Sequence, residues 1–215
     1  DSEFPVINSE KGIAHIILHF ADKALAENIS YIDGAACYNA VPDRSEIKIV
    51  NGSRLEAALI KAAGGALTSD IFKTAPLAER IVTDGNSFND YSIVNGAQTS
   101  IIAVGTAEHA STPEKGDSAL WKTLGVLAAY NDAIGSQYSE KIYEYLCTPL
   151  ASGKLGIYVN DPKSGDLSMC MSQAWIKDGE LSVVVDFRLP LGVKPEWVAD
   201  KLECALGCKA EIHDY

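Results

Sequence analysis

An Asp-Gly pair at residues 178–179 constrains the fold of this chain more than any other feature, because it lies between two apolar, strand-like segments. Asp-Gly is a preferred pair for the two-residue turns that join antiparallel strands. The stretch "LSMCMSQAWIKDGELSVVVDFRLP" (167–190) is therefore predicted to form a β-hairpin. A helix over 194–206, with Pro195 in its first turn, and a closing strand over 208–215 are predicted to follow it.

The preceding part of the chain also alternates between strand-like and helix-like segments. Strands are predicted at 12–21, 29–38, 45–50 and 97–107. Helices are predicted at 53–63, at 117–134, which is the longest, and at 136–146. The residues from 66 to 90 are ambiguous, with a short helix around 77–82 as one interpretation.

This order of elements predicts an α+β fold with two related ferredoxin-like halves. Each half would be an antiparallel sheet with helices packed on one face. The predicted division is a linker at 1–11, a first half at 12–150 that includes the turn around His109, and a second half at 151–215. The two halves share no repeat in residue identity, so their relationship rests on the order of elements alone.

The composition is that of an ordinary globular protein and excludes several functions. Hydrophobic residues make up 47% of the chain and charged residues 22%, with a formal net charge of −11. Such an acidic chain offers no surface for nucleic acid. No apolar run is long enough to span a membrane and no segment resembles a signal peptide, so a cytoplasmic location is predicted.

The five cysteines are scattered and odd in number, which argues against a disulfide framework and favours a reducing compartment. Cys204 and Cys208 are four residues apart, but no further His or Cys pair completes a tetrahedral metal site. Cys204 is predicted to lie on the apolar face of its helix. His15 and His19 are also four apart, and are predicted to share one face of a strand without binding metal. No metal ligand is predicted in this chain.

The stretch "GTAEHASTPEKGDSAL" (105–120) carries a histidine, His109, in a predicted strand-to-helix turn. Thr-Pro at 112–113 and Asp-Ser at 117–118 are both good helix starts. The positive end of a helix dipole would disfavour the imidazolium form of His109. A neutral imidazole can still donate one N–H to an oxygen that develops negative charge during a reaction. The alternative is a histidine that forms a hydrogen bond within the turn.

Four stretches, in order along the chain, resemble the lid domain of dinuclear-zinc peptidases and aminoacylases (metallopeptidase family twenty). "EHASTPEKGDSA" (108–119) resembles the family signature H-[AG]-S-x-P-x-x-G-x-[NS]-[AP]. "DGAACYNAVPD" (33–43) and "VVVDFRLPLGVKPEWVADKL" (183–202) are similar to segments of its PepV-type dipeptidases, and the opening "DSEFPVINSEKGI" (1–13) is similar to their link from the catalytic domain. The resemblance covers nearly the whole chain.

The resemblance implies that this chain is the lid fragment of a hydrolase, a cytoplasmic metallo-dipeptidase. The two zinc ions and the general base of that family belong to a catalytic domain whose H-x-D and E-E motifs are absent here. The fragment is therefore expected to hold no zinc and to be inactive alone. Its partners would be the catalytic domain of the same polypeptide and a dipeptide substrate, in an enzyme that is monomeric because its enlarged lid replaces a second subunit's lid.

Three residues match the family's functional positions. His109 would stabilise the oxyanion of the tetrahedral intermediate, Arg188 would grip the substrate carboxylate, and Asn39 would support the same end of the substrate by hydrogen bonds. Each has a structural alternative: a hydrogen bond within the turn for His109, an exposed salt bridge with Asp186 for Arg188, and a turn that ends a strand for Asn39.

The chain departs from the family pattern at three positions. Asp117 stands where Asn is usual, but it is expected to cap the following helix. Glu108 replaces a small residue and is expected to point away from His109. Ala40 replaces a common methionine, which leaves the substrate preference open.

Two other functions remain open from the sequence. One is a stand-alone module that binds an acidic peptide or an amino acid through Arg188 and Asn39. The other is a pure dimerisation domain that pairs a sheet edge with a second copy.

Overall fold

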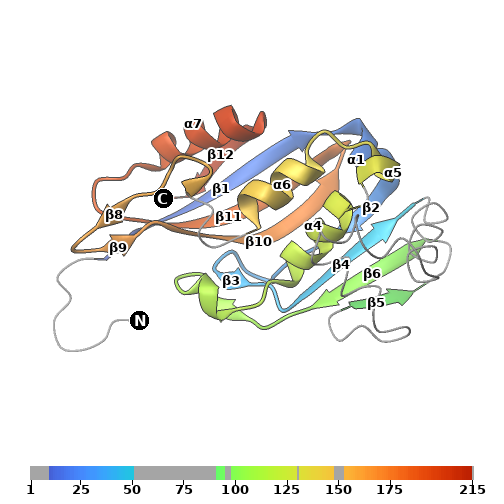
Figure 1. Ribbon diagram of the computed structural model, residues 1–215, viewed down its shortest axis with the longest axis horizontal. Helices are drawn as coiled ribbons and strands as arrows, with labels where there is room; N and C mark the ends of the chain where they lie inside the picture. The colour runs from blue at the N-terminus through green and yellow to red at the C-terminus, as the bar shows by residue number, and fades with distance from the viewer. Residues whose placement is uncertain (1–9, 51–90, 95–97, 130, 148–152, 215) are drawn as a thin grey trace, which may run out of the picture.

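The computed structural model describes residues 10–50, 91–94, 98–129, 131–147 and 153–214 (Figure 1). The helix predicted at 53–63, the ambiguous residues 66–90 and the linker up to residue 9 lie outside these ranges. Within them the strands form two four-stranded antiparallel sheets and two small two-stranded ladders. The predicted α+β class with antiparallel sheets is therefore confirmed.

The first sheet, sheet A, joins strands from both ends of the chain (Figure 1). Its strands in spatial order are β10 (Ser168–Lys177), β11 (Glu180–Leu189), β1 (Gly12–Ala21) and β12 (Lys209–Asp214). At the turn between β10 and β11, φ is 51° at Asp178 and 87° at Gly179. Positive φ at both central residues is typical of the type I′ turn, which confirms the predicted hairpin.

The second sheet, sheet B, lies beside sheet A. Its strands in spatial order are β2 (Ile29–Ile32), β4 (Arg44–Ile49), β6 (Thr99–Val104) and β5 (Tyr91–Val94). β2 is shorter than the predicted strand at 29–38. After Ile32 the chain leaves sheet B, and the Ala35 N–H donates to the Ser172 carbonyl on β10 at 2.7 Å. This hydrogen bond ties the segment after β2 to the edge of sheet A.

The two small ladders consist of very short strands. β3 (Ala40–Val41) pairs with β7 (Glu108–His109), and β8 (Asn160–Asp161) pairs with β9 (Gly165–Asp166). Neither ladder was predicted, because two-residue strands carry no periodic pattern.

The described helices are α1 (Lys23–Asn28), α4 (Ala119–Ala129), α5 (Asn131–Ile134), α6 (Ser139–Leu146), α7 (Pro195–Leu206) and the 3-10 turn η1 (Pro113–Lys115). The helix predicted at 117–134 is thus described as α4 and α5. α1 was not predicted. Its start is capped by Asp22, whose carboxylate accepts the Leu25 N–H at 3.1 Å. None of these helices is long and apolar enough to cross a membrane.

The start of α4 corrects one expectation. Ser118 is the capping residue, because its hydroxyl accepts the Trp121 N–H at 3.3 Å. Asp117, which was expected to cap the helix, instead pairs with Lys122, whose ammonium lies 2.5 Å from the carboxylate.

One apolar core contains residues from both sheets and from the helices. On β1 the side chains alternate, as expected for a strand with one buried face. Ala14, Ile16, Leu18 and Phe20 are fully buried in the core. His15 and His19 project from the opposite face, which confirms the prediction that they share a face.

The predicted boundary at residue 150 does not separate the two sheets. β1 lies between β11 and β12, and its Gly12–Ala21 backbone pairs with β11 along its whole length. The strand that opens the described chain therefore completes the sheet that its last strands form. Sheet B and helices α4 to α6 come between them in sequence.

Candidate functional site

The β3–β7 ladder brings two of the three predicted site residues near each other: His109 lies in β7, and Asn39 directly precedes β3. Ala40 and His109 are directly opposite each other, and the Ala110 N–H donates to the Asn39 carbonyl at 2.9 Å. The side chains of Asn39 and His109 are both exposed. Residues 70 positions apart in the sequence are thus brought together by a ladder of two-residue strands.

The β3–β7 ladder packs on β10 of sheet A through a small apolar cluster. Val41, Ala110 and Cys170 are buried together there. Cys170 is in turn the cross-strand partner of Asp186 on β11. The ladder therefore rests beside the part of sheet A that carries Asp186 and Arg188, the third predicted site residue.

Arg188 forms a two-fold hydrogen bond with Asp186. Its Nε donates to Oδ1 at 2.8 Å and its Nη2 donates to Oδ2 at 2.9 Å. The Asp186 side chain is fully buried, and that of Arg188 is only 9% exposed. The salt bridge weighed as an alternative role for Arg188 is therefore present. It is buried, however, and was expected to be exposed.

His109 forms hydrogen bonds within its own turn. Its Nδ1 lies 2.7 Å from the Ser111 hydroxyl and accepts the Ser111 N–H at 3.2 Å. Because Nδ1 is an acceptor, a neutral imidazole here carries its proton on Nε2. No hydrogen bond from a described residue occupies Nε2. The ring can therefore offer an N–H donor to a group outside the turn.

The helix that follows His109 differs from the expectation. Only the three-residue turn η1 begins nearby, and α4 starts ten positions later, at Ala119. A three-residue turn has almost no macrodipole, so the helix start on which the predicted dipole effect depended is not found next to His109. The direction of its ring proton is set by Ser111 instead.

Glu108 bends back onto the ladder. Its carboxylate accepts the His109 N–H at 2.8 Å and the Thr112 hydroxyl at 3.3 Å. The hydrogen bond from the His109 backbone is the main cause that lowers the pKa of Glu108. Glu108 therefore helps to hold the backbone of the turn.

A histidine that sequence reasoning left without a role lies next to the Arg188 salt bridge. His15 Nε2 is 3.1 Å from Asp186 Oδ2, and His15 Nδ1 is 2.5 Å from Asp214 Oδ1 on β12. Burial raises the pKa of Asp186, while the charges of Arg188 and His15 oppose this rise. The two histidines on the otherwise apolar strand β1 were the available signal, but they do not identify the partners.

The cysteines fit the expectation of free thiols, with one correction. All five are free, which confirms that there is no disulfide framework. Cys204 was expected on the apolar face of α7, but it is exposed. The buried positions of that helix are Pro195, Val198, Ala199, Leu202 and Leu206.

We expect thiol reagents to separate the cysteines by environment. Burial raises the pKa of Cys170 to about 12 and that of Cys208 to about 11, and it also raises the pKa of Cys147. Cys37 and Cys204 are exposed. At pH 8, mass mapping after a short iodoacetamide pulse should find label on Cys37 and Cys204, and label on Cys170 only after unfolding. Rapid native labelling of Cys170 would contradict the packing of the ladder on β10.

The base of the His109 turn depends on a glycine. Thr106 and Asp117 exchange two backbone hydrogen bonds, of 2.9 and 3.0 Å. A Cβ at Gly105 would lie 1.9 Å from the Asp117 carbonyl oxygen. Gly105→Ala is therefore expected to lower the free energy of unfolding by about 3 kcal/mol, the upper end for overpacking. Urea denaturation would measure it. Gly153→Ala, at a position with no atom within 4 Å, is the control and should change stability little.

The described residues do not form a metal site. No three His, Cys, Asp or Glu side chains among them are arranged to hold a metal ion.

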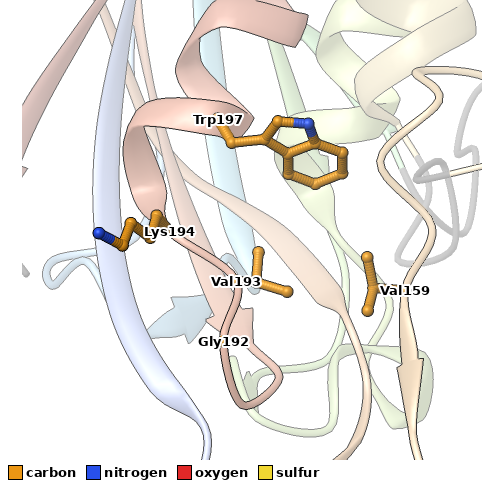
Figure 2. Close-up of a pocket in the computed structure, with 5 residues that line it drawn as sticks. All are labelled: Val159, Gly192, Val193, Lys194 and Trp197. Atoms are coloured by element: carbon orange, nitrogen blue, oxygen red, sulfur yellow. The ribbon is translucent and has the colours of Figure 1, made fainter.

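A pocket of about 330 Å³ at the start of α7 is lined by none of the predicted site residues (Figure 2). It is lined by Val159, Gly192, Val193, Lys194 and Trp197. In Figure 2 the Trp197 ring lies above Val193 and Val159, whereas the Lys194 ammonium points away from them. The lining includes no carboxylate, histidine or cysteine.

Comparison with known proteins leaves the family of this chain undetermined. No protein-family model and no curated protein matches the sequence.

Proposed function

We propose that this chain is the lid of a zinc-dependent dipeptidase of the PepV type, acting on a catalytic domain elsewhere in the same polypeptide. One observation carries the proposal: strands far apart in sequence bring Asn39 and His109 onto one ladder, and this ladder rests on the part of sheet A that carries Arg188. These are the three positions that match the family's motifs.

In this role the three residues would bind and orient a dipeptide. The exposed Nε2–H of His109 would donate to the oxygen that becomes negative when the peptide carbonyl is attacked. Arg188 would hold the free carboxylate of the substrate, and the Asn39 amide would add a hydrogen bond at the same end. In the expected catalytic domain, zinc would supply the activated water.

The buried salt bridge limits how Arg188 can act. The Nε edge of the guanidinium is already occupied by Asp186. A substrate carboxylate would therefore meet the other edge, formed by Nη1 and the second N–H of Nη2. The same limit weakens the alternative of a stand-alone module that binds acidic ligands through a free arginine.

The proposed family also implies two ferredoxin-like halves and a monomeric enzyme. The strand order β10-β11-β1-β12, with the crossover through α7, is that of a split βαβ unit, which supports a ferredoxin-like description of sheet A. Sheet B with α4 would be the other of the two ferredoxin-like halves. The enzyme would be a cytoplasmic monomer in which the lid closes over the bound substrate.

The test is hydrolysis by the full-length polypeptide. It should cleave dipeptides with a free carboxyl end, lose activity with a chelator and regain it with zinc. The same dipeptide with a terminal amide should be a poor substrate, because an amide cannot pair with a guanidinium. Failure to cleave any dipeptide, or full activity after zinc is removed, would reject the proposal.

A further inference from the structure

Four ionisable side chains on three neighbouring strands of sheet A form a continuous chain of contacts, here called the Arg188 cluster. It consists of His15 on β1, Asp186 and Arg188 on β11, and Asp214 on β12. Asp186 Oδ2 is shared: it accepts Arg188 Nη2 at 2.9 Å and lies 3.1 Å from His15 Nε2. Any rotation of the Asp186 carboxylate would therefore disturb its contacts with both Arg188 and His15.

His15 holds this carboxylate from the other side. Each of its ring nitrogens contacts a carboxylate oxygen, on Asp186 and on Asp214. One ring therefore connects both carboxylates, and the fully buried Asp186 side chain has two nitrogen-bearing partners, Arg188 and His15.

His15 also contacts the segment that carries Asn39. The Tyr38 ring packs edge to face on His15, with a centroid distance of 5.2 Å, and on His213 at 5.5 Å. Tyr38 is the immediate neighbour of Asn39 in the chain. His15 therefore contacts a neighbour of each residue proposed to bind the substrate carboxylate: Asp186, which pairs with Arg188, and Tyr38, which precedes Asn39.

The second histidine of β1 provides a natural comparison. His19 projects from the same face of the same strand, and its Nδ1 lies 2.8 Å from Glu180 and its Nε2 3.6 Å from Glu211. Like His15, it is flanked by two carboxylates. No arginine is found on either of these carboxylates among the described contacts.

We propose that His15 is a positioning residue shared by Arg188, through Asp186, and by Asn39, through Tyr38. By fixing both donors in one orientation, His15 raises the affinity for a substrate carboxylate without touching the substrate. This inference rests on the proposed function, in which Arg188 and Asn39 bind that carboxylate.

The test compares His15→Gln with His19→Gln in the full-length enzyme. For a dipeptide with a free carboxyl end, His15→Gln should raise KM about 10-fold, because a displaced binding group loses its alignment, and should leave kcat nearly unchanged. For the same dipeptide with a terminal amide, KM should be the same in both variants and in the wild type. An equal loss with both substrates, or an equal effect of His19→Gln, would show a purely structural role and overturn the inference.

A second readout does not depend on activity. In full-length protein labelled with ¹⁵N-arginine, the Arg188 Nε–H should exchange with solvent slowly in the wild type and clearly faster in His15→Gln. Asp214→Asn, at a carboxylate that is 56% exposed, is the milder variant and should shift the exchange rate in the same direction. Unchanged exchange in both variants would overturn the inference. A wild-type protein with no dipeptidase activity would instead reject the proposed function. The exchange rate of Arg188 Nε–H would still test whether His15 positions Arg188.

Discussion

Replacing His109 with alanine in the full-length enzyme is expected to lower kcat by about 10²–10³-fold while the zinc content stays unchanged, as for the loss of one oxyanion donor. The imidazole accepts the Ser111 N–H at Nδ1, which leaves the ring proton on Nε2, facing away from the turn. Its side chain is exposed, so its removal leaves no buried cavity. The loss should therefore appear in catalysis and not in stability. Steady-state kinetics with metal analysis would measure both.

Different substitutions at and around His109 test whether its role is to donate an N–H hydrogen bond. His109→Gln keeps an N–H donor and should retain more of kcat than His109→Ala. Ser111→Ala removes the hydroxyl at Nδ1 and should give an intermediate loss. His19→Ala, at the histidine that pairs with Glu180, is the control for the loss of an imidazole. A kcat that does not change in His109→Ala would exclude this residue from the mechanism.

Replacing Arg188 with methionine is expected to lower the free energy of unfolding by about 3–5 kcal/mol at pH 7, the range for a broken buried ion pair. The substitution removes the guanidinium from a fully buried Asp186 carboxylate and leaves the His15 ring as its remaining ion-pair contact. Urea denaturation at several pH values would measure the loss. The double variant Asp186→Asn/Arg188→Met should recover much of it, because no unpaired charge remains.

The sign of the pH dependence follows from Asp186. Its folded-state pKa is raised, mainly by burial, and removing Arg188 removes a charge that opposes this rise. A carboxyl with a raised folded pKa loses stability as pH increases from its ordinary value through the raised one. The deficit of Arg188→Met should therefore be largest at neutral pH and shrink in acid. Glu180→Gln, at a carboxylate that is 41% exposed, should change stability by less than about 0.5 kcal/mol at either pH.

Local patterns in the sequence predicted local structure well. Each of three elements carries its own signal in the sequence: turn chemistry at Asp178-Gly179, alternation in the strand at 12–21, and capping in the helix at 194–206. The partner of a strand carries no such signal. β1 joins β11 and β12, more than 150 residues later, and nothing in its sequence distinguishes that pairing from one within sheet B.

The candidate site divides in the same way. Motif resemblance identified Asn39, His109 and Arg188, and the structure brings the first two onto one ladder. The salt bridge of Arg188 could be anticipated because Asp186 is two residues away on the same strand, but its burial could not. His15 could not be assigned because its carboxylate partners lie 171 and 199 residues away.

The pairing of β1 with β12 also has a mechanical consequence. The strands run antiparallel, and His15, near the beginning of β1, lies opposite Asp214 at the end of β12. A force that pulled the start of β1 away from the end of β12 would break the hydrogen bonds of this ladder one after another. It would not load all of them at once, as a shearing force would. The first side-chain contact to break would be the one between His15 and Asp214. Such a force would therefore disturb the Arg188 cluster before it disturbed the apolar core.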